Sequence, residues 1–162
     1  MIDFSLIKII PADNSHYEFI YRVKKEAYGE YIRRIYGWEE NIQRKFFADD
    51  WAKQIPNVIL YDNALIGTIC FTKKEGPIFS GRFFIEHFYI LPEYQNKGIG
   101  SYVLKHFLDI ADNAGLPINL MVLTINPAAS LYARMGFETI DVREPIILTE
   151  RKPSRGNKDN KP

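Results

Sequence analysis

The sequence predicts a single α/β domain over residues 1–150, with a mixed, mostly antiparallel sheet of about seven strands and helices on both faces. Two observations lead to this prediction. Runs rich in β-branched and aromatic residues alternate with amphipathic helical patterns in the order strand, helix, helix, three strands, helix, strand, helix and two strands. A length of 162 residues, 46% of them hydrophobic, suits one packed core.

The N-terminal part is expected to supply one strand and two helices. Residues 6–10 form a short β-branched run that Pro11 stops. Ser15 and Glu18 have the spacing of a capping box, and the apolar stripe after them predicts a helix over residues 15–28, with its continuation past Gly29 left open. Acidic residues followed by an apolar face predict a second helix that ends near residue 49.

The remaining strands and helices follow in the central and C-terminal parts. Asp62 and Asn63 tolerate positive φ and separate two strand-like runs, which predicts an antiparallel hairpin. Nearly continuous hydrophobicity over residues 83–90 predicts a central strand that is covered on both faces. Further strands are expected at residues 118–123, 137–142 and 145–148, and further helices at residues 101–113 and 127–135.

The charge distribution argues against a nucleic-acid partner. The formal net charge is +1, and of the 21 Lys and Arg and 20 Asp and Glu residues, five and one respectively fall in residues 151–162. Residues 1–150 therefore carry 16 basic against 19 acidic side chains, whereas a nucleic-acid-binding domain gathers its basic residues on the domain itself. Residues 151–162 have no apolar anchor and are expected to form a disordered basic tail.

Other functional classes are disfavoured by what the sequence lacks. No basic region followed by an apolar run opens the chain, and no stretch approaches about 18 apolar residues, so we expect a cytoplasmic protein with no membrane partner. The single cysteine, Cys70, lies in an apolar run and is expected to be buried and inert. The three histidines are scattered and no paired metal-ligand spacing occurs, so we expect no metal site.

Residues 95–100, Gln-Asn-Lys-Gly-Ile-Gly, have the layout of a phosphate-binding loop, because a predicted strand precedes them and a predicted helix follows. A pyrophosphate can approach backbone N–H groups where glycine leaves out the Cβ, and the first turn of a helix adds N–H donors at the positive end of its dipole. The dinucleotide fingerprint would need a third glycine where Val103 stands, and the Walker sequence does not occur, so both nucleotide motifs are disfavoured.

A second motif follows about thirty residues later, at residues 126–137, Asn-Pro-Ala-Ala-Ser-Leu-Tyr-Ala-Arg-Met-Gly-Phe. The chain thus contains Q-x-x-G-x-G after a strand that ends in aromatic-x-Ile-x-Pro, and then N-x-x-A-x-x-L-Y-x-x-x-G-F. This ordered pair resembles the GCN5-related N-acetyltransferase (GNAT) superfamily. The resemblance is specific over residues 83–137 and only architectural before them.

The resemblance implies a GNAT-like fold in which two central strands splay apart around acetyl-CoA, the coenzyme A thioester that donates the acyl group. The Ile90 backbone N–H would then face the thioester oxygen as an oxyanion donor. The residues that the resemblance assigns to this cofactor lie on the central strand, in the glycine loop and in the second motif: Phe88, Ile90, Gln95, Asn96, Lys97, Gly98, Ile99, Gly100, Ser101, Asn126 and Tyr132.

Two residues are candidates for catalysis. Glu86 lies on the strand where family members commonly carry a general base, although an ionisable group in a buried strand can equally be a structural anchor. Tyr132 occupies the Leu-Tyr position of the family motif, where a phenol commonly protonates the departing thiolate, and a phenol with a usual pKa of about 10 stays protonated at neutral pH. The alternative is a tyrosine that only covers its helix. Asn126 is expected to cap that helix as well as to contact the cofactor.

In the family, the first two helices and their link form one wall of the acceptor pocket. This region is aromatic here, and Glu26 and Glu30 lie nearby. We expect a small-molecule amine as the partner, and a monomer or homodimer. Two alternatives stay open, an acetyltransferase of protein N-termini or lysines and a non-catalytic acyl-CoA sensor. The candidate substrate-binding residues are Tyr28, Tyr31, Trp38 and, if a bulge breaks strand alternation, His87.

Overall fold

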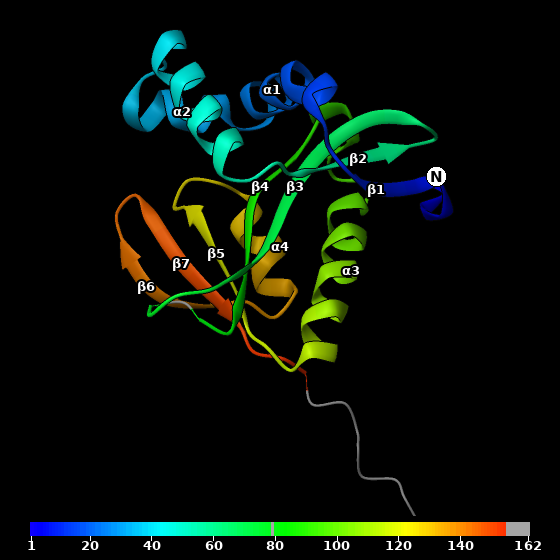
Figure 1. The fold of residues 1–162 in the computed structure, drawn as a ribbon, viewed down its shortest axis with the longest axis vertical. Coiled ribbons are helices and arrows are strands. Elements are labelled where there is room, and N and C mark those ends of the chain that lie inside the picture. Colours follow the sequence, from blue (N-terminus) through cyan, green and yellow to red (C-terminus); the bar gives the residue numbers. More distant parts are fainter. Residues whose placement is uncertain (79, 155–162) are drawn as a thin grey trace, which may run out of the picture. The chain divides into compact units, whose positions relative to one another are not determined.

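The computed structural model describes residues 1–78 and 80–154 (Figure 1). Within these residues the chain forms seven strands and four α-helices in the order that the sequence predicts. They are β1 (Ile7–Pro11), α1 (Tyr17–Tyr36), α2 (Glu40–Lys53), β2 (Asn57–Tyr61), β3 (Ala64–Lys74), β4 (Arg82–Ile90), α3 (Ile99–Ala114), β5 (Ile118–Leu123), α4 (Ala128–Arg134), β6 (Glu138–Arg143) and β7 (Ile146–Arg151).

The seven strands form one sheet of order β1-β2-β3-β4-β5-β7-β6. The pairs β1–β2, β2–β3, β5–β7 and β6–β7 are antiparallel, and β4 pairs with β5 in parallel. A parallel pair needs a long crossover, which α3 supplies. The predicted mixed, mostly antiparallel sheet is confirmed, and β4 is its middle strand, as the continuous hydrophobicity of residues 83–90 predicts.

The chain forms two compact units that share elements. Met1–Phe71 and Glu86–Gly100 make the first unit, while Thr72–Ile85 and the chain from Ser101 onward make the second. β3 and β4 each pass from one unit to the other, and α3 begins in the first unit and continues in the second. The glycine loop and the two N-terminal helices therefore belong to the same unit.

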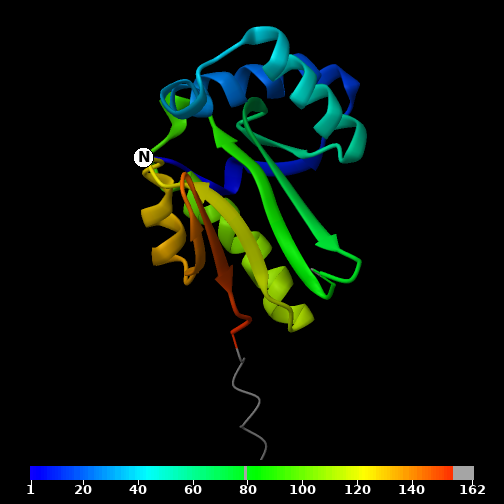
Figure 2. The ribbon, with the colours of Figure 1, turned by 90° about the vertical axis from the view of Figure 1, so that its left-hand side faces the viewer.

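In the first unit, α1 and α2 pack on β2 and β3 through a mainly hydrophobic core (Figure 2). Tyr21 of α1, Phe47 of α2 and Val58 of β2 are buried there. The Phe47 ring meets Tyr21 and Tyr17 edge-on, with 5.3 and 4.8 Å between ring centroids. Edge-to-face pairs add to the free energy of burial, so this core holds both helices firmly on the strands.

The start of α1 differs from the predicted one. The Asp13 carboxylate accepts a hydrogen bond from the Ser15 N–H at 2.9 Å, and His16 Nδ1 accepts one from the Asp13 N–H at 3.1 Å. Asp13 and His16 thus form the capping box that we assigned to Ser15 and Glu18. The reason is a short 3-10 turn at Asn14–His16, which the apolar stripe of the helix does not reveal.

The predicted hairpin between β2 and β3 is confirmed. Asp62 and Asn63 have φ values of 47° and 64°, and Tyr61 pairs with Ala64 across the two-residue loop. Positive φ at both central residues gives the turn the twist that antiparallel strands need.

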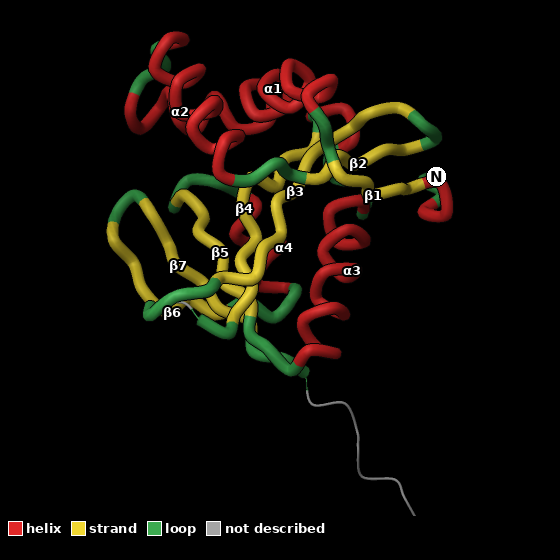
Figure 3. The backbone as a smooth tube through the Cα atoms, in the orientation of Figure 1, coloured by secondary structure: helices red, strands yellow, loops and turns green. Residues whose placement is uncertain are grey.

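In the second unit, β5, β7 and β6 lie side by side, and α4 packs on β5 (Figure 3). A buried asparagine joins three strands there. The Asn119 side-chain amide donates to the Thr149 carbonyl oxygen at 3.1 Å, and Asn119 Oδ1 accepts from Arg82 at 2.9 Å. Both ends of the Asn119 amide thus have a partner, which limits the cost of its desolvation.

The last strand runs slightly past the predicted domain boundary. Arg151 is the final residue of β7, and its guanidinium makes two hydrogen bonds to the Asp112 carboxylate, at 2.7 and 3.1 Å. Arg151, which we predicted as the first residue of the tail, therefore belongs to the last strand. Residues 155–162 of that tail lie outside the described residues.

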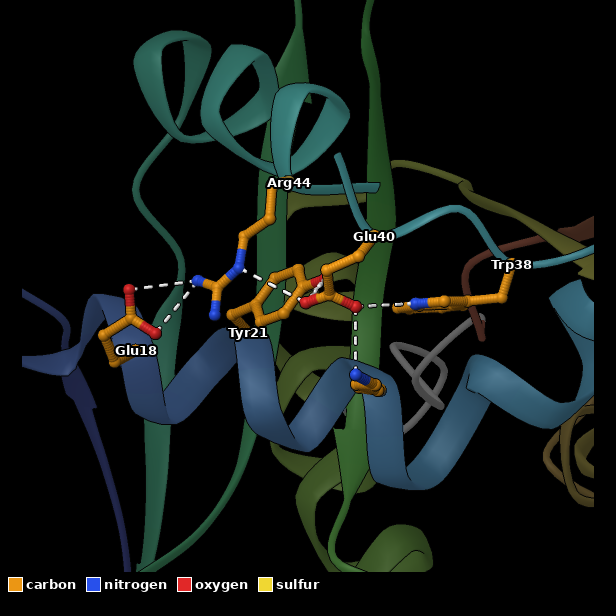
Figure 4. A network of polar contacts seen from close by, with 6 residues as sticks. Glu18, Tyr21, Trp38, Glu40 and Arg44 are labelled. Atoms are coloured by element: carbon orange, nitrogen blue, oxygen red, sulfur yellow. Dashed lines mark hydrogen bonds and ion pairs between the residues drawn. The ribbon is translucent and has the colours of Figure 1, made fainter. Parts of the chain in front are cut away.

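A polar network joins α1, α2 and the link between them (Figure 4). Glu40, the first residue of α2, accepts hydrogen bonds from the Trp38 indole at 2.8 Å, from Lys25 Nζ at 2.9 Å and from the Tyr21 hydroxyl at 2.9 Å. These three donors lower the pKa of Glu40 from 4.5 to about 2. Burial, together with the hydrogen bond to Glu40, raises the pKa of Tyr21 to about 12.

Arg44 extends the network by one helical turn. Its guanidinium lies 3.7 Å from the centre of the Tyr21 ring and binds both carboxylate oxygens of Glu18, at 3.0 and 2.9 Å. Arginine suits this position because its planar group can stack on a ring and bind a carboxylate at the same time. The network fixes the angle between α1 and α2 at the point where the chain turns from one to the other.

This network should make stability depend on acid pH. A carboxyl group whose pKa is lowered by folding contributes stability that is present above its unfolded pKa and is lost as the pH falls through its folded pKa. We expect the wild-type protein to lose part of its free energy of unfolding between pH 4.5 and about 2, and Glu40→Gln to be less stable at neutral pH but to lose less across this window. Urea unfolding at several pH values measures this, and parallel pH curves for the two proteins would contradict it.

Candidate functional site

The glycine loop connects β4 to α3 through a short 3-10 turn at Pro92–Tyr94. Asn96 and Gly98 have positive φ, 57° and 83°, so the backbone turns sharply twice before the helix begins. A Cβ on Gly98 would lie 3.1 Å from the ring of Phe4, besides requiring a strained backbone. Glycine at position 98 is thus demanded by the local geometry.

The side chain of Gln95 ties the loop to the end of β4. Its amide Nε2 donates to the Ile90 carbonyl oxygen at 2.8 Å, and its backbone N–H donates to Pro92 at 3.1 Å. Ile90 itself is buried. We predicted Gln95 as a cofactor ligand, and in the structure its side-chain amide positions the loop.

The loop offers the groups that an anion needs. Asn96, Lys97 and Gly98 are exposed, while Ile99 is buried and anchors the first turn of α3. Gly100 and Ser101 follow in that turn and are half-buried. Lys97 Nζ lies 5.9 Å from the centre of the Tyr94 ring. Lys97 thus places a cation just before the start of α3, where the first N–H groups have no partner within the helix. A pyrophosphate fits this set of donors and this charge.

β4 leaves the extended conformation at His87. His87 has a φ of 51°. This positive φ interrupts the alternation of side chains between the two faces of the sheet, which would otherwise point His87 to the opposite face from Glu86 and Phe88. Gly67 of β3 accommodates the displaced backbone, because a Cβ there would lie only 2.5 Å from the Tyr89 carbonyl oxygen. Glu86 and Phe88, on either side of His87, are both half-buried.

Aromatic and ionisable side chains gather around His87. Its Nε2 lies 3.6 Å from an oxygen of Asp50 in α2, and its Nδ1 lies 3.5 Å from the Tyr89 hydroxyl. The Tyr89 ring in turn is 5.2 Å from Tyr28, and Tyr28 is 6.1 Å from Tyr31, between ring centroids. Three of the four predicted acceptor residues therefore lie in one cluster, which we call the His87 cluster.

Sequence reasoning missed two members of this cluster. Tyr89 is two residues after His87. The signal in the sequence was the pair of ionisable residues, Glu86 and His87, within a hydrophobic strand, because such a pair can mark a break in the alternation of side chains. Asp50 gave no signal, because an acidic residue near the end of a helix is ordinary on any surface. Burial of the Tyr28 phenol raises its pKa to about 12, so this side chain is neutral across the physiological range.

Trp38, the fourth predicted acceptor residue, has a different environment. Its indole N–H binds Glu40 at 2.8 Å, and its ring lies against Gly29, where a Cβ would be 3.3 Å from it. α1 continues through Gly29, so this glycine makes room for Trp38 and does not interrupt the helix. The expected negative charge of the wall is also compensated, because Glu30 pairs with Arg33 at 2.6 Å and Glu26 with Arg22 at 4.0 Å.

The second motif lies in the other unit. Asn126 Oδ1 accepts a hydrogen bond from the Ala128 N–H at 2.9 Å, which confirms the predicted cap of the short helix α4. Tyr132, in that helix, is 8% exposed and meets the Phe137 ring edge-on at 5.9 Å. Most of the Tyr132 side chain is therefore buried.

Other chemistry finds little support in the described residues. Cys70 is 2% exposed, as predicted. Within residues 1–78 and 80–154, no group of three or more His, Cys, Asp and Glu side chains is arranged to hold a metal ion. None of the helices there is long and apolar enough to cross a membrane.

Comparisons with known proteins agree with this geometry. Among solved structures, PaiA N-acetyltransferase from Thermoplasma acidophilum in complex with coenzyme A has a TM-score of 0.70 at 21% identity, covering 90% of this chain and 98% of that one. The ribosomal-protein-S18-alanine N-acetyltransferase from Escherichia coli has a TM-score of 0.66 at 16% identity, with 96% and 99% covered. Naa50 from Arabidopsis thaliana, bound to the bisubstrate analogue CoA-Ac-MVNAL, has a TM-score of 0.64 at 21% identity, with 91% and 99% covered.

These likenesses are low in identity and establish the fold. No curated protein sequence matches the chain significantly. The model of the acetyltransferase (GNAT) family, however, matches residues 17–137. This range covers most of the chain and contains both motifs. The chain therefore belongs to the GNAT family of acetyl-CoA-dependent acetyltransferases.

Proposed function

We propose that the protein transfers the acetyl group of acetyl-CoA directly to the amine of a small molecule. The observation that carries this proposal is the loop at residues 95–100, where Gly98 turns the backbone with a φ of 83° and Gln95 anchors the loop to β4. Such a loop suits the pyrophosphate of a CoA thioester, and the family supplies the reaction.

Holding the donor is the task of the loop and of β4. Lys97 offers a cation, and the N–H groups from Gly98 to Ser101 offer hydrogen bonds at the positive end of α3. When bound, acetyl-CoA supplies an activated acyl group and a thiolate as leaving group. The backbone N–H of Ile90 is our candidate for the donor that stabilises charge on the thioester oxygen, and Phe88 and Asn126 are candidate contacts of the pantetheine arm.

Two side chains are proposed to move protons. Glu86 would remove the proton of the acceptor ammonium, directly or through water, so that the amine can attack. Tyr132 would give its phenolic proton to the sulfur as the carbon–sulfur bond breaks. Since positioning alone can supply roughly 7 to 11 kcal/mol of the barrier, single changes at these residues should leave residual activity.

A second acceptor class competes with small amines. The likeness to the S18-alanine enzyme and to Naa50, which was bound to a peptide-based analogue, favours a protein N-terminus. A screen decides between them: purified protein with acetyl-CoA is offered amines, polyamines, amino acids, aminoglycosides and N-terminal peptides, and thiol release is followed. Turnover restricted to peptides would overturn the small-molecule proposal, and turnover restricted to small amines would support it.

Reversing the charge of Lys97 should weaken donor binding. Lys97→Glu places a carboxylate where the pyrophosphate is expected, so the Kd for CoA should rise about tenfold or more in calorimetry. Lys45→Glu is the control, since Lys45 is also an exposed lysine, on α2, and should change the Kd less than twofold. Substitution of Gly98 is a poorer test, because its positive φ and the Phe4 ring would disturb the fold as well. Equal affinities in the wild type and Lys97→Glu would remove the loop from the binding site.

The two proposed proton carriers should shape the pH dependence of the rate. The base must be ionised and the phenol protonated, so kcat should rise and then fall with pH. Glu86→Gln should flatten the rise, and Tyr132→Phe should flatten the fall while lowering kcat by on the order of 10²-fold at unchanged CoA affinity. Tyr36→Phe, at an exposed tyrosine, serves as the control. A Tyr132→Phe protein that keeps kcat and loses CoA affinity would reassign Tyr132 to binding.

Aromatic residues of the α1 region should separate into two groups. Tyr31→Ala should raise the acceptor KM several-fold with little change in the acetyl-CoA KM, because Tyr31 belongs to the His87 cluster. Trp38→Phe should instead lower the Tm by about 2–4 °C with an unchanged acceptor KM, since it loses the hydrogen bond to Glu40. An acceptor KM that rises for Trp38→Phe and stays constant for Tyr31→Ala would reverse these roles.

A further inference from the structure

Lys24 of α1 is a buried lysine without a close partner. It is 7% exposed, on the helix face that also carries Tyr28 one turn later. Within the described part of the chain, no hydrogen bond or ion pair engages its ammonium group, and Asp50 is the charge that acts on it. Burial lowers the pKa of Lys24, and the charge of Asp50 only partly opposes this.

The one carboxylate near Lys24 is already shared. Asp50 lies 3.6 Å from His87 Nε2 and 3.9 Å from Lys53 Nζ. Asp50 is thus near Lys24 of α1, Lys53 of its own helix α2 and His87 of β4, and the His87 ring lies in turn near the Tyr89 phenol. Lys53 is largely exposed to solvent, so the buried ammonium of Lys24 is the one whose charge is left without a close counter-charge.

An unpaired ammonium in this place is unfavourable for the fold alone. Desolvation of a charge is costly, and a methionine or leucine at position 24 would fill the same helix face without that cost. A buried titratable group beside an ionisable, aromatic cluster is a candidate for a binding group. An anion at the Lys24 ammonium would offset the cost of burying this charge.

We propose that Lys24 binds the carboxylate of the acceptor, so that the acceptor is an amino carboxylate such as a free amino acid. The inference rests on the proposed function and narrows its substrate class. The acceptor carboxylate would supply the counter-charge of the Lys24 ammonium, while the rings of Tyr28 and Tyr89 would flank its apolar part. Lys24 is then a specificity residue and takes no part in bond breaking.

The experiment compares each of a set of L-amino acids with its carboxamide, which keeps the amine and removes the negative charge. The ratio of kcat/KM for acid over amide is measured in the wild type and in Lys24→Met, and the quotient of the two ratios cancels the different basicity of the two amines. We expect this quotient to be about 10 to 100, because a charge-assisted contact is lost. Activity on the amides should stay within twofold.

Two controls separate this specific role from general effects. Lys53→Met removes a charge from the same Asp50 on an exposed side chain, 76% accessible, and should change the quotient less than twofold. Lys24→Met should melt at the same or a higher temperature than the wild type, since a desolvated charge is removed. If Lys24→Met does not fold, Lys24→Gln takes its place.

A binding measurement makes the inference independent of turnover. The same amino acids, added without acetyl-CoA, should raise the Tm of the wild type more than their carboxamides do, and Lys24→Met should lose this difference. An unchanged acid-to-amide preference in a folded Lys24→Met protein would overturn the inference while leaving acetyl transfer intact. CoA binding without transfer to any amine would defeat the proposed function instead, and the melting comparison would still decide the role of Lys24.

Discussion

The close approach of β4 to Gly67 is the constraint on which the site depends. A Cβ added at position 67 would lie only 2.5 Å from the Tyr89 carbonyl oxygen, so no residue other than glycine would let β4 follow this course. The strand can then depart from the extended conformation at His87, and its end is held by two hydrogen bonds, from Leu91 N–H to Ile66 at 2.8 Å and from Gln95 to Ile90 at 2.8 Å. Loop and strand are thereby positioned by one backbone and one side-chain hydrogen bond, and such surrounding contacts are how an unusual backbone conformation persists.

The helices α1 and α2 carry two contrasting charged groups. Glu40 is half-exposed and has three hydrogen-bond donors, so its charge is fully compensated and its pKa falls. Lys24 is buried and has none of this support, so its pKa falls for the opposite reason, because the charged form is disfavoured. The first arrangement stabilises the packing of the two helices. The second carries the cost of desolvating a charge, which the proposed binding of a carboxylate would offset.

The sequence was sufficient for the parts of the molecule that depend on local chemistry. Asp62 and Asn63 predicted a hairpin, Asn126 a cap, and Gly98 a sharp loop, because each effect operates within a few residues. Tertiary effects were not accessible in this way. Trp38 is predicted as an acceptor residue, and its contacts with Gly29 and Glu40 in the helix network depend on the packing of residues that are apart in the sequence. The positive φ of His87 and its contact with Asp50 follow from the approach of β4 to a glycine in another strand.

This difference in range also explains why the donor is easier to identify than the acceptor. A pyrophosphate is recognised by consecutive backbone N–H groups, so its binding loop is one short segment with a fixed glycine pattern. The proposed acceptor site draws single side chains from α1, α2 and β4, namely Tyr28, Asp50 and His87, and their distances depend on the packing of three elements. Small changes in that packing, or one exchange such as a neutral residue at position 24, would alter the charge that the site prefers. Acceptor specificity can therefore change without disturbing the loop that holds the donor.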